Sequence, residues 1–172
     1  MLAIVHFFVD ICLLRRAPQD LPASQLVLGL VIGASLLGSM LLAMTAGEMA
    51  LIGLLQGALD TGFLLVLLYG ILRLVDKPTR FLQTGTALIG ADTLIGLFAL
   101  FPLSLAGSVD ETSPVRVLAA MVFLMLVVWG VTATAHILRH AFEIRLSQGV
   151  FLAIAYDVLS FMVIGGMTQS LG

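Results

Sequence analysis

Residues 50–72 read ALIGLLQGALDTGFLLVLLYGIL, an apolar run whose single charged residue, Asp60, lies near its middle. In a lipid bilayer the backbone amides of a segment must be hydrogen-bonded internally, so long apolar runs are expected to form helices. A helix of about 20 residues crosses the roughly 30 Å of hydrocarbon. This stretch therefore predicts a transmembrane helix that carries an acid at mid-depth.

The composition of the whole chain agrees with a membrane protein. Of its 172 residues, 60% are hydrophobic and 10% are charged, whereas soluble domains carry about 25% charged residues. Glycine, proline and charged residues typical of loops separate five apolar runs. The expected spans are about 25–45, 49–75, 81–106, 116–138 and 149–170. We therefore expect one all-α domain over residues 1–172, a polytopic transmembrane helical bundle of about five spans.

The amino-terminal stretch MLAIVHFFVDICLL is apolar but too short to cross a membrane. His6 and Asp10 lie four positions apart, which places both on one face of a helix. We predict that residues 1–16 form an amphipathic helix lying in the cytoplasmic interface; a re-entrant hairpin or a sixth, shortened span is the alternative. Pro22 and Ser24 then mark the start of the first long helix.

Basic residues are distributed unevenly between the two ends of a five-span bundle. Arg116 falls at one end, and the other seven fall at the opposite end: Arg15, Arg16, Arg73, Lys77, Arg80, Arg139 and Arg145. Lys and Arg in short loops accumulate on the cytoplasmic side of a membrane. We therefore expect a multi-pass inner-membrane protein with its amino terminus in the cytoplasm and its carboxy terminus in the periplasm.

Two glycine pairs have the spacing that lets helices approach closely in lipid, Gly29-x-x-x-Gly33 and Gly53-x-x-x-Gly57. The spans that carry them are joined by a very short loop, which favours an antiparallel hairpin. We expect both pairs to pack inside the bundle, and an oligomer interface is the alternative.

Three acids lie deep in the apolar runs: Asp60, Asp92 and Asp157. A charge at the bilayer centre costs about 2.5–3.5 kcal/mol even on permissive scales, so such residues usually face the bundle interior or a cavity. No Lys or Arg lies at a comparable depth, and desolvation and mutual repulsion both disfavour three ionised carboxylates in one dry site. We predict an intramembrane polar cluster, which either hydrogen-bonds the bundle together, forms a proton or cation pathway, or docks a basic residue of another subunit.

His136 and His140 lie four positions apart at the predicted cytoplasmic end of the fourth span. Two imidazoles on one face can ligate a metal or, with a further histidine such as His6, a haem. Arg139 and Glu143 nearby also fit an ordinary polar helix end, where cations suit the carbonyl end of the helix dipole. We favour the polar helix end, retain the pair as a candidate interfacial site, and expect neither a metal nor a cofactor.

The sequence lacks the common catalytic motifs, including Cys-x-x-Cys, His-Glu-x-x-His, Gly-x-Ser-x-Gly and a phosphate-binding glycine-rich loop. No basic and aromatic cluster indicates nucleic-acid binding. We therefore expect a non-enzymatic accessory, assembly or scaffold component of a membrane complex, whose partners are the lipid bilayer and other membrane subunits or further copies of itself. The alternative is a proton- or cation-coupled carrier or channel that uses the three aspartates.

A short motif, Asp20-Leu21-Pro22, precedes the five closely spaced helices. In this plan the chain resembles Yip1-like five-helix membrane proteins, although the usual Yip1 continuation of the motif is missing. Three further phrases are similar to small uncharacterised inner-membrane proteins of proteobacteria: RRAPQDLPAS (15–24), RFLQTGTALIGADTLI (80–95) and AHILRHA (135–141). The resemblance implies a trafficking, assembly or scaffold role and supplies no catalytic residues.

Overall fold

The computed structural model describes residues 2–110 and 112–169, and the regular structure within these ranges is entirely helical. The elements in chain order are α1 (Leu2–Cys12), η1 (Pro18–Asp20), α2 (Gln25–Thr45), α3 (Ala50–Leu74), η2 (Pro78–Arg80), α4 (Phe81–Gly107), α5 (Pro114–Phe142) and α6 (Leu146–Gln169). The helices α2 to α6 are long and apolar enough to cross a membrane. The predicted fold class is therefore confirmed, and the chain has the architecture of a multi-pass membrane protein.

Helix ends follow the local capping chemistry. The Ser24 side chain accepts a hydrogen bond from the Val27 amide at 3.4 Å and so caps the start of α2, as the sequence predicted. Ser113 caps α5 in the same way, ahead of a proline in the first turn. The structure extends α5 four residues beyond its predicted end at 138 and starts α6 three residues before its predicted start at 149. Both differences arise because polar residues at this end of the bundle remain helical.

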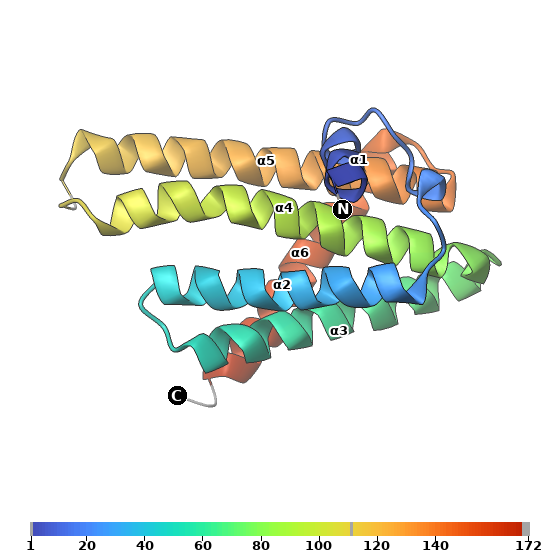
Figure 1. Ribbon diagram of the computed structural model, residues 1–172, viewed down its shortest axis with the longest axis horizontal. Helices are drawn as coiled ribbons and strands as arrows, with labels where there is room; N and C mark the ends of the chain where they lie inside the picture. The colour runs from blue at the N-terminus through green and yellow to red at the C-terminus, as the bar shows by residue number, and fades with distance from the viewer. Residues whose placement is uncertain (1, 111, 170–172) are drawn as a thin grey trace.

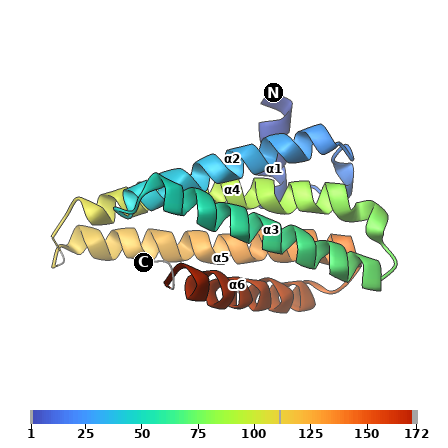
Figure 2. The same ribbon diagram turned by 90° about the horizontal axis from the view of Figure 1, so that it is seen from below.

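The helices α2 to α5 run side by side and alternate in direction, and α6 crosses behind them obliquely (Figure 1). The helix α2 packs closely on α3 and α4, and α4 also packs on α5. The last helix, α6, lies mainly along α5 and meets α3 over a much smaller surface. Figure 2 shows α6 on the side of the bundle opposite α1. The loosely joined edge between α3 and α6 is important below, because the cavities of the protein lie beside it.

The helices α2 and α3 pack closely because two glycines of α3, Gly53 and Gly57, face α2. A Cβ atom added at Gly53 would lie 2.5 Å from the Ala43 Cβ and 2.7 Å from the Ser39 carbonyl oxygen. A Cβ at Gly57 would lie 2.5 Å from the Ser39 Oγ. Carbon atoms pack best at roughly 3.5–4.0 Å, so any larger residue at either position would force the two helices apart. Gly53 and Gly57 therefore pack inside the bundle, against α2, as predicted.

The other glycine pair corrects an expectation. Gly29 and Gly33 are exposed, and a Cβ added at either would have nothing within 4 Å. They lie on the outer surface of α2 and do not pack inside the bundle. The sequence could not separate the two pairs, because their spacing is identical and only the rotation of each helix distinguishes them.

The short helix α1 lies crosswise on the bundle, against α4 and α5 (Figure 2). Its inner face is fully apolar: Phe7, Phe8, Ile11 and Cys12 are buried, and the Phe8 ring occupies the space that a side chain at Gly90 would need. Its outer face carries Val5 and Val9 beside His6 and Asp10. At 11 residues it is too short to span a bilayer. The buried face is thus apolar and the outer face holds the polar residues His6 and Asp10, as an amphipathic helix requires, while its position in the membrane interface stays a prediction.

The alternation of the helices brings most basic residues to one end of the molecule. The linker between α1 and α2, the α3–α4 loop and the α5–α6 loop gather there, at the right of Figure 1. The α2–α3 and α4–α5 loops lie at the opposite end. We call the first end the basic end, defined by Arg15, Arg16, Arg73, Lys77, Arg80, Arg139 and Arg145.

Candidate functional site

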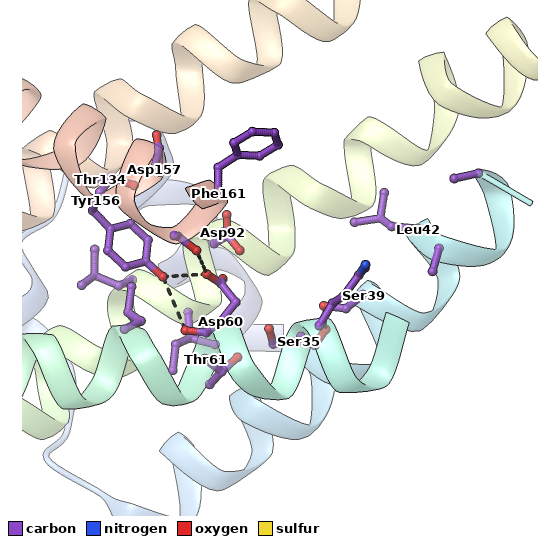
Figure 3. A pocket seen from close by; sticks show the side chains of 18 of the residues that line it. Ser35, Ser39, Leu42, Asp60, Thr61, Asp92, Thr134, Tyr156, Asp157 and Phe161 are labelled. Atoms are coloured by element: carbon purple, nitrogen blue, oxygen red, sulfur yellow. Dashed lines mark hydrogen bonds between the residues drawn. The ribbon is translucent and has the colours of Figure 1, made fainter. Parts of the chain in front are cut away.

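An acidic cavity of about 680 Å³ lies among α2, α3, α4 and α6, with one residue contributed by α5. Asp60, Asp92 and Asp157 all line it, so three helices bring the three predicted acids to one space (Figure 3). The other polar lining residues within the chain are uncharged apart from Glu48; they are Ser35, Ser39, Gln56, Thr61, Thr134, Tyr156 and Ser160. Lys, Arg and His are absent from the described lining. The cavity therefore offers oxygen atoms and negative charge, and it suits a positively charged occupant.

The three acids lie at similar depth in the bundle. Asp60 is the eleventh residue of the 25-residue α3, and Asp92 and Asp157 are the twelfth residues of the 27-residue α4 and the 24-residue α6. The lining begins at Glu48, in the α2–α3 loop, and reaches Leu64 in α3. Within α3 the lining runs from Gln56 to Leu64, which is roughly 12 Å at 1.5 Å per residue. The cavity thus extends from the end opposite the basic end to beyond the middle of the bundle.

Asp60 is held by hydrogen bonds from α6. The Tyr156 hydroxyl donates to Asp60 Oδ1 at 2.9 Å, and the Ser160 hydroxyl donates to the same oxygen (Figure 3). The Tyr156 ring also stacks on Phe63, with the ring centroids 6.1 Å apart. Because α6 otherwise meets α3 over little surface, this cluster is the main polar connection between the two helices. These hydrogen bonds fit the first of the three predicted alternatives, in which the acid joins helices of the bundle.

Asp92 and Asp157 differ from Asp60 in having no hydrogen-bond or ion-pair partner among the described residues. Both side chains are exposed at the cavity surface although they lie halfway along their helices. The charge of Asp92 is close enough to interact with those of Asp60 and Asp157. A carboxylate at membrane depth needs a proton, water or a cation beside it. These two acids are therefore the groups in the cavity that are available to an incoming ligand.

The acids do not form a ready-made metal site. Within residues 2–110 and 112–169, no group of three His, Cys, Asp or Glu side chains is close enough to hold a metal ion together. A cation in this cavity would thus meet the carboxylates one or two at a time, with water or hydroxyl groups on its other sides. That arrangement suits a hydrated ion or an organic cation better than a tightly coordinated metal.

The sequence identified the acids but missed Tyr156. Helical spacing places Gln56, Gly57 and Asp60 on one face of α3, and all three line the cavity. Tyr156 is one of only two tyrosines in the chain and directly precedes Asp157. A phenol in the middle of an apolar span needs a hydrogen-bond partner when it is buried, and this was the signal that could have found it.

The basic end of the bundle is closed by hydrogen bonds to the last turn of α5. Arg80 donates to the carbonyl oxygens of His140 and Ala141 at 3.2 and 3.0 Å. Lys77 and Arg80 both form ion pairs with Glu143, at 2.7 and 2.6 Å. Cations beside the carbonyl end of a helix also stabilise its dipole. The α3–α4 loop is therefore held to the end of α5 at the basic end of the bundle.

Glu143 lies outside the long helices and is exposed. Its hydrogen bonds with Lys77 and then Arg80, together with the charges of both, hold the pKa of Glu143 below its ordinary value of 4.5. Its backbone has a φ of 59°, in the left-handed region that ends many helices. The two ion pairs hold this residue in a conformation that non-glycine residues rarely adopt.

The two histidines belong to this closed end. A ring nitrogen of His136 (Nε2) lies 2.9 Å from the Arg16 carbonyl oxygen, and the rings of His136 and His140 meet edge to face at 4.7 Å. The His140 carbonyl oxygen also accepts a hydrogen bond from Gln19 at 2.7 Å. These contacts join the amino-terminal linker to α5, as expected of a polar helix end. The described residues place no third metal-ligating side chain beside the pair.

Comparison of the chain with protein-family models, with curated proteins and with solved structures finds no match. Its function must therefore be inferred from the site itself.

Proposed function

We propose that this protein is a membrane carrier that binds a small cation at Asp92 and Asp157 and exchanges it for protons. The observation that supports this proposal is that three mid-helix acids line one cavity of about 680 Å³ that lacks basic lining residues. Cavities of roughly 300–1,000 Å³ are typical of small-molecule sites. An acid at membrane depth is strongly disfavoured as an ion without a partner. Each acid of the site is therefore stabilised either by a proton or by a bound cation.

Proton coupling follows from the same chemistry. In the empty site one of the acids holds a proton, because negative charges that lie close together in one cavity repel one another. When a cation enters, the acid ionises, the carboxylate pairs with the cation, and the proton leaves to water. Release of the cation reverses the step. The exchange therefore conserves the charge of the site.

The closed basic end supports a carrier over an open channel. The cavity reaches the end that carries Glu48, while Lys77, Arg80 and Glu143 tie the other end shut. A carrier needs such a conformation and a second one with the opposite opening. In the second conformation the ion pairs at the basic end would separate and the mouth beside Glu48 would close.

Proton flux in proteoliposomes tests the proposal. The interior pH is followed with a trapped dye while Na⁺, K⁺, tetramethylammonium or benzyltrimethylammonium is added outside. We expect at least one cation to drive proton movement in the wild type, and Asp92→Asn with Asp157→Asn to abolish it. Asp110→Asn is the matched control, because Asp110 is exposed in the α4–α5 loop and does not line the cavity. Equal flux in wild-type, double-variant and empty liposomes would refute the carrier proposal.

We further propose that the basic end faces the cytoplasm of the cell that makes the protein, in its inner membrane. The chain has eight Lys and Arg residues, and seven of them lie at this end, which supports that orientation. The cavity mouth and the carboxy terminus would then face the periplasm. A carboxy-terminal alkaline phosphatase fusion should be active and a fluorescent-protein fusion dark; the reverse result would invert the orientation.

An accessory or assembly role in a membrane complex is the second candidate. The exposed Gly29 and Gly33 favour it, since small residues on a helix surface let another helix approach closely. The resemblance to Yip1-like proteins implies the same kind of role. Purification from native membranes tests it: a partner should co-purify with the wild type and be lost in Gly29→Leu with Gly33→Leu. Recovery of the wild type without any partner would contradict it.

A further inference from the structure

A second, apolar pocket directly adjoins the acidic cavity. It has a volume of about 150 Å³ and lies among the four helices α3 to α6. Leu64, Leu88, Thr134 and Tyr156 line both spaces and form the boundary between them. Apart from Thr134 and Tyr156, its lining residues are all aliphatic or aromatic. An occupant of the acidic cavity could therefore extend an apolar part into this pocket.

The size and lining of the pocket indicate what kind of group it takes. A volume of about 150 Å³ lined by apolar side chains is large enough for a ring the size of benzene. A hydrated inorganic ion would leave such a pocket empty. A phospholipid or fatty acid is also a poor fit, because its acyl chain is far longer than the pocket and its anionic headgroup would face Asp92 and Asp157.

We propose that the ligand is an aromatic organic cation, an ammonium joined by a short linker to one aryl ring. The ammonium lies between Asp92 and Asp157, and the ring occupies the pocket beyond Tyr156. The rings of Tyr156 and Phe161 line the acidic cavity, and aromatic faces attract ammonium groups. This inference rests on the proposed function, since it names the substrate class of the same site.

A pair of cations that differ by one ring tests the inference. Tetramethylammonium carries the charge alone, and benzyltrimethylammonium replaces one of its methyl hydrogens with a phenyl group. Binding of each to the full-length protein in lipid nanodiscs is measured by calorimetry, with empty nanodiscs as the blank for partition into lipid. We expect benzyltrimethylammonium to bind roughly ten- to a thousand-fold more tightly, because its ring leaves water for the apolar pocket.

Variants that fill the pocket locate the ring. Ala155 and Leu152 line the apolar pocket and not the acidic cavity. Ala155→Phe, or Leu152→Trp if the first variant is not monodisperse, should abolish the preference for the benzyl compound and leave tetramethylammonium binding unchanged. Ala120→Phe is the control, because Ala120 is exposed on α5 and lines neither space. Asp92→Asn should weaken the binding of both cations.

The outcomes separate the two proposals. Equal affinity for the two cations in the wild type would overturn the aromatic-cation inference and leave the cation site intact. Tighter binding of dodecyltrimethylammonium than of the benzyl compound would also overturn it, in favour of a long-chain ligand. Absence of binding by every cation tested, with the protein monodisperse, would refute the cation site itself. A benzyl preference that persists in both filled variants would place the ring elsewhere and reject the pocket.

Discussion

The packing of α2 on α3 predicts that alanine substitutions at two glycines, which look equivalent in the sequence, change the stability of the protein by different amounts. Gly53→Ala and Gly29→Ala are the same chemical change, each in a Gly-x-x-x-Gly pair and each in the first five residues of its helix. At Gly53 the new Cβ meets the Ala43 Cβ at 2.5 Å and the backbone of Ser39 and Met40 at 2.7 and 3.0 Å. At Gly29 it meets nothing within 4 Å.

The expected difference between these two variants follows from overpacking. Both gain helix propensity of up to about 1 kcal/mol, and this gain cancels in the comparison. Extra carbon atoms forced into a packed interface cost roughly 1–3 kcal/mol. The neighbours of Gly53 are mostly backbone atoms, which cannot rotate away, so we expect the upper part of this range. An upper-range cost of about 2–3 kcal/mol means that the unfolding equilibrium constant of Gly53→Ala should exceed that of Gly29→Ala by about 30- to 150-fold.

Unfolding in mixed micelles measures this difference. Sodium dodecyl sulfate is titrated into protein in a mild detergent, and the fluorescence of Trp129, the single tryptophan, reports the transition. Its indole N–H donates to the Cys12 carbonyl oxygen at 2.7 Å, so the signal depends on folded contacts. Gly53→Ala should shift the midpoint to less sodium dodecyl sulfate, and Gly29→Ala should leave it unchanged or raise it. Equal midpoints would refute the packing that we describe.

Two further predictions use the same assay. Tyr156→Phe removes the hydrogen bond to Asp60 and should destabilise the bundle by about 0.6–1.7 kcal/mol; an unchanged midpoint would show that packing alone holds α6. Ion pairs with Lys77 and Arg80 lower the pKa of Glu143, so its stabilisation exists above its ordinary value of 4.5 and is lost as pH falls through the lowered value. From about pH 5 to about pH 3 the wild-type midpoint should fall more than that of Glu143→Gln; parallel curves would contradict this.

The long helices could be predicted because their signal is local. Apolar runs of about 20 residues are dictated by the hydrocarbon thickness, and the start of α2 at Gln25 and its end at Thr45 matched the sequence boundaries. The predicted end of α5 and the predicted start of α6 were less accurate, by four and three residues. The end of α5 is held by contacts with the α3–α4 loop, such as the hydrogen bonds from Arg80 to the carbonyl groups of His140 and Ala141, about 60 residues away in the chain.

The site was predictable in its charges and not in its geometry. Burial cost alone indicates that Asp60, Asp92 and Asp157 face inward. Helical periodicity does not say which acid meets a partner, because that depends on how α6 is rotated against α3. The structure shows that Asp60 is hydrogen-bonded and that Asp92 and Asp157 are open to the cavity. The apolar pocket beside them is assembled from four helices, α3 to α6, and leaves no pattern in any one of them.

Thiol accessibility tests most directly whether the cavity is a water-filled cation site within the membrane. Ser35→Cys introduces a thiol into the cavity, and Leu37→Cys places one at similar depth on the exposed face of α2. The native Cys12 is buried, and burial raises its pKa to about 11, so it forms too little thiolate to react near neutral pH. Both variants are treated in nanodiscs with trimethylammonium-ethyl methanethiosulfonate. The account predicts rapid modification of Ser35→Cys, slowed by benzyltrimethylammonium, and little modification of Leu37→Cys; equal rates at the two positions would contradict it.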